Sequence, residues 1–494
     1  MKAALALTDL LGDRTARPDG YVRLSVDAGT WTALVAGLAQ GRHELSALWA
    51  DHGVMRMALN DPRLGQRAIV SVETDGGRYP SVSAHHAPAL RLERAMRDLY
   101  AVQPTGLPDS RPWLDHGKWP GREGGARYPF LPSEGEGLHQ IPVGPVHAGI
   151  IEPGHFRFTA NGETIVRLEQ RLGYVHKGVE GLMAGATLEQ AARMVGRLSG
   201  DSTVAYSWAF ARAVEAALDW TPPPRAVLLR AVMAELERVA HHINDVGAIC
   251  NDASVITMNA RCTLQREDVL AVAHACFGHR FMMDRIVPGG VTADLTPDGA
   301  GKIRGLLTRL DETRGEIQRV YDSMPSLQDR TVSTGVVRLE LANQYAAGGF
   351  VGRACGRPFD ARKTFTYAPY DRLDFEVKVR TTGDVDARLL VRLDEIAESH
   401  GILSQLLGRL TAGEIRGNRP AATAGDGAAL VEAFRGDVFV SVRLAADGRL
   451  AHVHARDASW FQWPLLEAAI EGNIVADFPL CNKSFNCSYS GQDL

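Results

Sequence analysis

The sequence predicts an α+β protein in which a small N-terminal α+β domain precedes a large, mainly helical bundle with peripheral β-hairpins. Short β-branched runs and one amphipathic helix occupy residues 21–102, whereas long stretches of helical periodicity fill much of 180–412. A segment rich in proline and glycine separates the two regions. At 494 residues the chain is also too long for one ordinary core, so more than one domain is expected.

The N-terminal domain, residues 1–120, is predicted from its hydrophobic patterning. Runs rich in β-branched residues favour strands, and an apolar stripe beside a charged face favours a helix over 87–102. The strand runs are 21–27, 54–59 and 68–74. Residues 121–140 are interpreted as a linker, because the many Pro and Gly residues of 103–140 interrupt regular structure.

The second domain, residues 141–494, opens with a hairpin signal. Alternating strands flank Asn161-Gly162, a dipeptide favoured in two-residue turns. The tail returns to strands over 437–457, about a turn at Asp447-Gly448. The long helices expected between these β segments are 180–216, 224–251, 264–285, 297–324 and 385–412.

Composition excludes several classes of protein. The net charge of -4, without a long Lys/Arg run, gives no electrostatic case for nucleic-acid binding. No stretch of about 18 uncharged apolar residues occurs, so no transmembrane segment is expected. Six cysteines in a chain of this length are ordinary usage for a reducing cytoplasm and do not indicate a disulfide framework.

One predicted helix carries a row of ionisable residues. Glu235, Arg238, His242 and Asp245 are joined by steps of three and four residues, beside an apolar stripe. The row is either a solvated helix face or a buried ionisable row that holds or relays a proton. Periodicity alone leaves both interpretations open.

Histidines mark two further candidate sites. His176 and Glu180 lie one turn apart if a helix starts there, and such a pair passes a proton or sets each partner's pKa. His147 and His155 belong to a Gly/Pro-rich loop before the hairpin and could bind a small polar head group. Simple surface positions remain the alternative for all of them.

Four positions have the spacing at which paired thiolates would chelate a metal. Ser199 and Ser202 have two residues between them, and so do Ser488 and Gly491. Thiolates bind nickel or iron, whereas a serine hydroxyl is hard and stays protonated near neutrality. Glycine offers no side chain at all. These residues therefore predict no metal site.

Several segments occur in one order between about 141 and 494: "GPVHAGIIEPGHFRF", "GYVHKGVE", "ELERVAHHINDVGAIC", "RIVPGGVTADLT", "GGFVGRACGRPFDARKTFTYAPYDRLDFEV" and "GDVDARLLVRLDEIAESHGIL". Together they resemble the superfamily of complex I 49-kDa subunits and membrane-bound (group 4) [NiFe]-hydrogenase large subunits. Before them, "RYPSVSAHHAPALRLERAMRDLYAVQPTGLPDSRPWLDHGKWP" is similar to the complex I 30-kDa subunit. The chain thus resembles a natural fusion of the two, as in formate hydrogenlyase-type complexes.

The resemblance aligns these serines with metal-binding positions of other family members. The hydrogenase members carry two Cys-x-x-Cys pairs that bind the nickel–iron centre, and those columns fall on Ser199, Ser202, Ser488 and Gly491. The resemblance implies a metal-free member, as in complex I. A cleft left by the metal should then lie between the Ser199–Ser202 turn and a C-terminal strand over Ser488–Gly491.

The resemblance to complex I implies part of a quinone site. The acidic residue that partners the quinone histidine aligns with Asp252, and the loop with His147 and His155 should border the cleft. The quinone-binding tyrosine is missing, because its column falls at or near Gly200 and Tyr206 belongs to another column. The helix with the ionisable row should lie at the bundle centre, with Arg238 paired to a carboxylate.

The expected function is that of a metal-free, electron-accepting and coupling subunit of a complex I-like, ion-translocating membrane oxidoreductase, either of the NADH:quinone oxidoreductase kind or hydrogenase-related, with the electron donor left open. Quinone is the expected substrate, held and protonated by His147 or His155 with Asp252. Iron–sulfur clusters would belong to a partner subunit, beside antiporter-like membrane subunits, and the chain would lie peripherally on the cytoplasmic side of the cell membrane. The alternatives are a non-catalytic scaffold and an active [NiFe]-hydrogenase. The groups expected to feed protons are His176, Glu180, Glu235, Arg238, His242 and Asp245.

Overall fold

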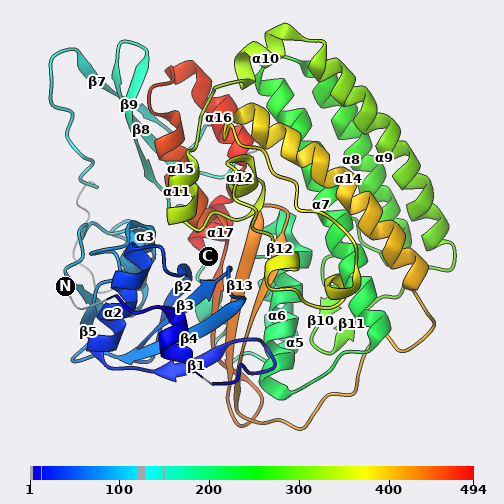
Figure 1. Cartoon of the computed structure of the whole chain (residues 1–494), viewed down its shortest axis with the longest axis horizontal. Helices are drawn as coiled ribbons and strands as arrows, with labels where there is room; N and C mark the ends of the chain where they lie inside the picture. Colours follow the sequence, from blue (N-terminus) through cyan, green and yellow to red (C-terminus); the bar gives the residue numbers. More distant parts are fainter. Residues whose placement is uncertain (1–3, 13, 120–127, 148–150) are drawn as a thin grey trace.

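The computed structural model describes residues 4–12, 14–119, 128–147 and 151–494, and it confirms the α+β class (Figure 1). Its N-terminal part is a four-stranded sheet of order β1-β4-β3-β2, in which only the β1–β4 pair is parallel. The β2–β3 turn places His52 and Gly53 at φ 47° and 81°, as a tight two-residue hairpin requires. The elements are α1 (Leu7–Leu11), β1 (Val22–Ser25), α2 (Ala28–Ala39), β2 (Glu44–Asp51), β3 (Val54–Asp61), β4 (Gln66–Glu73), β5 (Arg78–Pro80), α3 (Leu90–Tyr100) and β6 (Gln103–Thr105).

A three-stranded antiparallel sheet follows, formed by β7 (Leu138–Val143), β8 (His155–Asn161) and β9 (Thr164–Arg171). The expected β8–β9 hairpin is confirmed, but its turn lies one residue later than predicted: Asn161 pairs with Thr164, and the turn residues are Gly162, at φ 58°, and Glu163.

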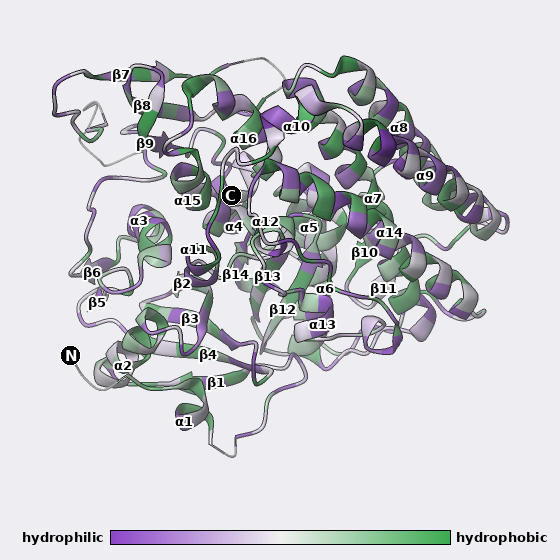
Figure 2. Cartoon of the chain, turned by 45° about the horizontal axis from the view of Figure 1, so that its top comes forward, coloured by the Kyte–Doolittle hydropathy of each residue, from purple (hydrophilic) through white to green (hydrophobic). Residues whose placement is uncertain are grey.

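The large helical part is built around α7 (Pro224–Asp252), which contacts α8 (Ile256–Phe277), α14 (Val385–Arg409) and α16 (Phe478–Phe485) (Figure 1). Proline at its first position fits a helix start, because the missing N–H has no partner there in any case. The outer helix α9 (Gly299–Asp322) buries residues at helical spacing and carries hydrophilic residues elsewhere (Figure 2). The remaining elements of this part are β10 (Ile286–Val287), β11 (Gly290–Val291), α10 (Pro325–Thr331), α11 (Leu339–Gln344), α12 (Gly349–Ala354) and α13 (Ala361–Thr364).

Two of the expected helices are wrong in extent. The stretch 180–216 is three α-helices, α4 (Val179–Met183), α5 (Leu188–Val195) and α6 (Thr203–Leu218), because Gly185 takes φ 77° and Thr187 caps a new helix with Gln190. The expected 264–285 helix is α8, which starts at Ile256 and stops at Phe277, where Gly278 takes the left-handed conformation of a C-cap.

The C-terminal region holds a sheet of order β12-β13-β14 and three helices. Helix α6 lies on β12 so closely that a Cβ at Gly427 would stand 1.9 Å from the Ala213 carbonyl oxygen. The sequence analysis expected the β13–β14 hairpin but neither β12 nor the helices. The elements are β12 (Gly425–Ala433), β13 (Gly436–Leu444), β14 (Leu450–Arg456), α15 (Ser459–Ile470), α16 and α17 (Tyr489–Asp493).

Polar contacts join the N-terminal sheet to the rest of the chain. Arg357 pairs with Glu44 at 2.6 Å, and Arg443 pairs with Asp51 at 2.7 Å. The Arg456 guanidinium donates to the Ser46 carbonyl oxygen at 2.6 Å. Within the described residues, no helix has the length and apolar content needed to cross a membrane.

Candidate functional site

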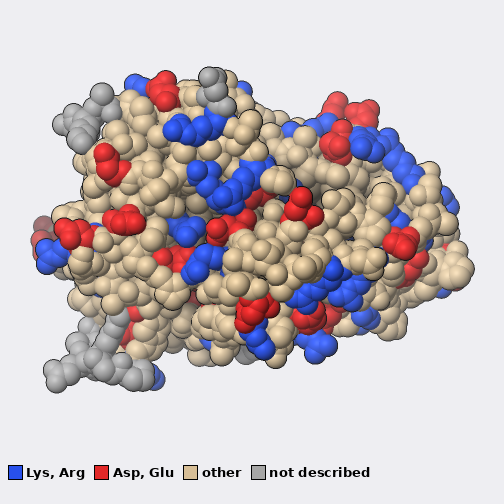
Figure 3. All heavy atoms as spheres, turned by 90° about the horizontal axis from the view of Figure 1, so that it is seen from below, with Lys and Arg blue, Asp and Glu red and all other residues tan. Residues whose placement is uncertain are grey.

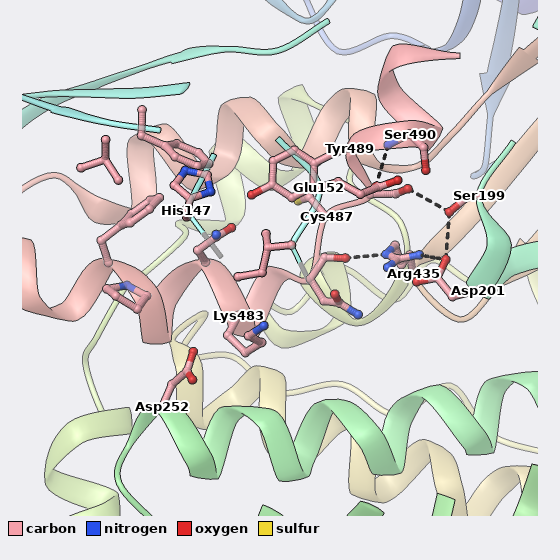
Figure 4. Close-up of a pocket in the computed structure, with 18 of the residues that line it drawn as sticks. His147, Glu152, Ser199, Asp201, Asp252, Arg435, Lys483, Cys487, Tyr489 and Ser490 are labelled. Atoms are coloured by element: carbon pink, nitrogen blue, oxygen red, sulfur yellow. Dashed lines mark hydrogen bonds and ion pairs between the residues drawn. The ribbon is translucent and has the colours of Figure 1, made fainter. Parts of the chain in front are cut away.

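A cleft of about 580 Å³ lies where the C-terminal helices meet the turn before α6 and the loop after β7 (Figure 4). Ser199, Ser488, His147 and Asp252 all line it, so the structure brings together residues from four distant segments. Its apolar lining residues are Val143, Ile151, Phe156, Phe478, Pro479 and Tyr489. Its polar lining residues include Glu152, Asp201, Arg435, Asn482, Lys483 and Asn486.

The serines in this cleft bond to one another. Ser199 Oγ lies 2.8 Å from Ser488 Oγ and donates to Asp201 Oδ1 at 2.8 Å. Because a hydroxyl carries one proton, Ser488 is then the donor between the two serines. Ser488 Oγ accepts from the Gly491 backbone N–H at 2.9 Å and caps α17. Ser488–Gly491 is therefore the start of a helix, and the expected strand is wrong.

Gly491 stands where a side chain would clash. A Cβ there would lie 2.6 Å from Asp457 Oδ2, an oxygen that accepts from the Tyr206 hydroxyl at 2.6 Å. Ser202 and Gly491 also lie outside the residues that line the cleft. Three hydroxyls, one of them (Ser202) outside the cleft lining, and a glycine with no room for a side chain do not fit a thiolate-bound nickel–iron centre. The metal-free state itself stays a prediction.

A neutralised ion pair forms part of the polar lining. The Arg435 guanidinium donates to both carboxylate oxygens of Asp201, one of them at 2.7 Å. Burial opposes ionisation of Asp201, but the adjacent Arg435 charge holds its pKa well below the usual range. Arg435 also donates to the Asn486 carbonyl oxygen. This pair carries no net charge into the cleft.

Asp252 and Lys483 provide the titratable groups at the other end of the cleft (Figure 4). Burial raises the pKa of Asp252, and the Lys483 charge opposes the shift only in part. Asp252 therefore holds a proton at higher pH than an exposed carboxyl. Proton transfer to a bound acceptor needs such a group.

The two loop histidines have different surroundings. His147 lines the cleft, and its ring centre lies 5.4 Å from that of Phe156. Partial burial lowers the pKa of His147, so its imidazole is mainly neutral at pH 7 and has one N–H to donate. No hydrogen bond joins the described side chains of His147 and Asp252, so the expected orienting contact is wrong.

His155 does not line the cleft, contrary to expectation. It starts β8, where its Nδ1 bonds to the Gly144 carbonyl oxygen at 3.1 Å and its ring packs 4.9 Å from that of Phe130. Since alternate residues of a strand face opposite sides, His155 and Phe156 cannot both face the cleft.

His176 and Glu180 do not form a pair, because helix α4 begins at Val179 and His176 precedes it. His176 Nδ1 bonds to the Asp493 carbonyl oxygen at 2.7 Å. Glu180 instead accepts from the Ala455 N–H at 2.8 Å and lies 3.0 Å from His454 Nδ1. The structure thus places the two candidates in separate hydrogen-bond sets.

The ionisable row of α7 is buried, so its interpretation as a solvated face is wrong. Glu235 and His242 are 0% exposed, Arg238 is 1% and Asp245 is 2% exposed. Arg238 pairs with Glu235 at 3.3 Å, as expected from the resemblance, and donates to the Glu432 carbonyl oxygen at 2.8 Å. Asp245 accepts from Asn486, a cleft residue, at 2.9 Å. The row therefore runs from the cleft into the protein interior.

The interior end of the row belongs to a buried ion cluster that is short of one positive charge. His242 donates from Nε2 to Glu395 at 2.8 Å as a neutral ring, because burial lowers its pKa. Burial, and then the neighbouring Asp360 charge, raise the pKa of Glu432, which makes it the carboxyl that retains a proton. The cluster contains the carboxylates of Glu235, Asp360, Glu395 and Glu432 and the guanidinium groups of Arg238, Arg353 and Arg362.

Sequence reasoning missed several cleft residues. Asp201 lies between the two serine columns and could have been noticed there. Tyr489 likewise lies between Ser488 and Gly491, whereas Arg435 and Lys483 come from segments without any periodic or spacing signal. The Tyr489 hydroxyl is of particular interest, because it is buried at the cleft and its only hydrogen-bonding neighbour among the described residues, Asn482, lies outside good hydrogen-bond geometry. In Figure 4 it points toward His147.

Comparisons with known proteins agree with this architecture. A family model described as the respiratory-chain NADH dehydrogenase 49 Kd subunit matches residues 252–426. The carbon monoxide-induced hydrogenase of Rhodospirillum rubrum is 31% identical over 350 residues, which cover 70% of this chain and 97% of the relative. Formate hydrogenlyase subunit 5 of Escherichia coli is 29% identical and covers 86% of this chain and 79% of its own length.

Two further comparisons concern the fusion and the fold. The C/D subunit of the NADH-quinone oxidoreductase of Phocaeicola vulgatus is 27% identical over 423 residues, 76% of this chain and 80% of the relative. A chain of the membrane-bound sulfane sulfur reductase, an archaeal respiratory membrane complex, superposes with a TM-score of 0.69 at 24% identity. That match covers 73% of this chain and 99% of the other, and it shows a shared fold.

Proposed function

Because the chain belongs to the superfamily of complex I 49-kDa subunits and hydrogenase large subunits, with a fused C/D architecture, we propose that it is the electron-accepting subunit of a complex I-like membrane oxidoreductase. It passes electrons to a quinone or another small acceptor in the cleft. The observation that carries this proposal is the cleft itself, which is lined by Ser199 and Ser488 of the former ligand positions and by both apolar and polar side chains. Such a lining suits a ring with polar carbonyl groups.

The cleft residues supply hydrogen bonds and protons in this proposal. The Tyr489 hydroxyl and the neutral His147 ring, which face Asn482 and the Gly154 backbone, turn to donate to the acceptor carbonyl groups, so Tyr489 takes over the role of the missing tyrosine. Reduction of a quinone to a quinol consumes two electrons and two protons. Asp252, with its raised pKa, supplies a proton at the cleft, and the row from Asp245 to Glu235 resupplies it.

The rest of the assembly follows from the family. We place a partner subunit with iron–sulfur clusters as the electron donor and antiporter-like subunits in the membrane. The chain would attach peripherally to the cytoplasmic side of the cell membrane and bind no metal. A non-catalytic scaffold that couples these partners is the second candidate, because the family's fold persists without the ligand columns.

The test uses Tyr489→Phe, Asp252→Asn and His147→Ala in the purified complex, with His155→Ala as the matched histidine variant. Quinone reduction is measured beside reduction of the iron–sulfur clusters. Loss of a proton donor at Asp252 should lower turnover by about 10²-fold. Loss of the Tyr489 hydrogen bond should lower it about tenfold. His155→Ala should retain turnover, since its ring lies outside the cleft.

Normal turnover in all three cleft variants would exclude this acceptor site and favour the scaffold. Elemental analysis separates the third alternative, because an active [NiFe]-hydrogenase needs about one nickel per chain. The same measurement tests the predicted metal-free state directly.

A further inference from the structure

A second pocket, of about 450 Å³, lies beside α5 and the β10–β11 turn. It is lined from one side by α5 and the residues after it, and from the other by the loop at 284–288 and the strap at 416–419. These elements lie toward the lower side of the molecule in Figure 1, and the view from below shows Lys and Arg side chains gathered in groups on this face (Figure 3). The proposed acceptor site uses none of these residues.

The lining of this pocket is strongly basic. Its five arginines face two carboxylates, Asp284 and Glu189, so three guanidinium charges are in excess. Arg197 makes a two-pronged ion pair with Asp284 at 2.8 Å, and Arg419 pairs with Glu189 at 3.1 Å. The excess charges belong to Arg193, Arg285 and Arg416.

Those three arginines have no carboxylate partner among the described residues. Arg285 donates only to the carbonyl oxygens of Phe277 and Gly278, at 2.7 and 3.2 Å. The exposed side chains of Arg193 and Arg416 make no hydrogen bond or close ion pair with the part of the chain that the structure describes. Like charges gathered around one concavity repel one another, and a bound anion relieves that repulsion.

The pocket also has an apolar side, which includes Leu188, Ile286, Pro288 and Trp220. Trp220 is only 6% exposed, and its Nε1 has no hydrogen-bond partner among the described residues. A buried indole N–H usually finds a partner, so this unpaired donor marks a place for an acceptor atom. The pocket thus combines an apolar surface, one free donor and a basic rim.

We propose that this pocket binds an organic phosphate, with the phosphate at the arginines and the organic portion against the apolar side. A guanidinium presents its N–H groups as a fork that matches two phosphate oxygens, and it stays charged at every physiological pH. The volume fits a small molecule. A free nucleotide and an anionic phospholipid head group share this chemistry, and the experiment distinguishes them.

The experiment measures binding of ADP, inorganic phosphate and vesicles of phosphatidylglycerol or phosphatidylcholine to the purified full chain. If the ligand is a free nucleotide, we expect ADP to bind; if it is a lipid head group, we expect vesicles of phosphatidylglycerol but not of phosphatidylcholine to bind. In either case inorganic phosphate should compete with the ligand, and added salt should weaken its binding. In the double variant Arg193→Gln, Arg416→Gln, affinity should fall about tenfold or more, as for lost charged hydrogen bonds. The control is Arg304→Gln, an exposed arginine of α9 outside the pocket.

The thermal midpoint of each variant checks that it is folded. Both substituted pocket arginines are exposed and unpaired, so the midpoint should not change. The proposal is overturned if neither ADP nor phosphatidylglycerol binds, or if the double variant binds as tightly as the control. Binding of an acidic hexaglutamate peptide in place of both phosphate ligands would also overturn it, since the pocket would then accept an acidic partner segment.

Discussion

Arg238→Ala should destabilise the protein far more than a surface change does. Arg238 is 1% exposed, pairs with Glu235 and donates to the carbonyl oxygens of Glu432 and Ala433 at 2.8 and 3.1 Å. Its removal leaves those carbonyl oxygens without the hydrogen bonds that Arg238 donates. It also leaves the four carboxylates of the buried cluster with only two guanidinium groups. Breaking a buried pair in this way costs about 3–5 kcal/mol of unfolding free energy. An exposed control, Arg304→Ala, should change it by about 0.5 kcal/mol or less.

The loss should also depend on pH in a defined direction. Burial works to raise the pKa of Glu235, and Arg362 and then Arg238 hold it below its usual value. Without Arg238 the folded-state pKa of Glu235 rises, and that of Glu432, which burial and Asp360 already raise to about 7, rises further above its unfolded value. The folded variant then binds more protons than the unfolded chain, so its stability falls as pH rises, by up to about 1.4 kcal/mol per pH unit for one proton.

Urea unfolding at pH 5.5, 7 and 8.5 measures both effects on the free energy of unfolding. Hydrogen exchange of the α7 amides, measured separately, reports the same effects within this helix. The difference between wild type and Arg238→Ala should grow across this series, while Arg304→Ala should show no such trend. Equal stability of the two variants at pH 7 would refute the assigned role of the cluster. A difference that shrinks with rising pH would refute the charge argument.

Three further predictions concern the former ligand positions and the thiols. Gly491→Ala should lower the unfolding free energy by about 1–3 kcal/mol, because its Cβ would lie 2.6 Å from Asp457 Oδ2, and unchanged urea stability would contradict the overlap. Replacing the residues at all four former ligand positions by cysteine should for the same reason create no stoichiometric nickel site, as measured by elemental analysis. All six cysteines are free and buried, and burial raises the pKa of Cys250 to about 12. A thiol reagent should therefore label no cysteine in the folded protein and all six after unfolding. Rapid labelling of the folded protein would show instead that a thiol is exposed.

The sequence predicted the parts of this fold that have strong local signals. The Asn161-Gly162 hairpin and the long helix from Pro224 were both expected, because a turn dipeptide and a sustained period need no tertiary information. Helices α16 and α17 were missed, since 8 and 5 residues are too short to show a period. Helix α4 was merged with its neighbours because the turns between them are only a few residues long.

The residues of the candidate site could be predicted only where the family resemblance aligned them with functional positions of other members. Ser199, Ser488, His147 and Asp252 were named beforehand, and the structure places all four on one cleft. Arg435 and Lys483 could not be found, because only tertiary packing brings them there. The burial of the α7 row was likewise outside the reach of periodicity, which describes a charged stripe but not what covers it. The functional roles of all these residues stay predictions.

The charges around the cleft favour a neutral acceptor. Asp201 and Arg435 cancel each other, which leaves Lys483 facing Glu152 and Asp252. The Lys483 charge is therefore balanced by Glu152 alone or outweighed by both carboxyls, according to whether Asp252 holds a proton. An anionic acceptor would find no excess positive charge there, whereas a quinone needs none in its oxidised form. A neutral quinone remains neutral on reduction only if two protons accompany the two electrons, since a charged product held in a partly apolar cleft would be costly. Carboxyls whose pKa values are raised by burial, Asp252 at the cleft and Glu432 in the buried cluster, are therefore the kind of proton donor that this chemistry requires.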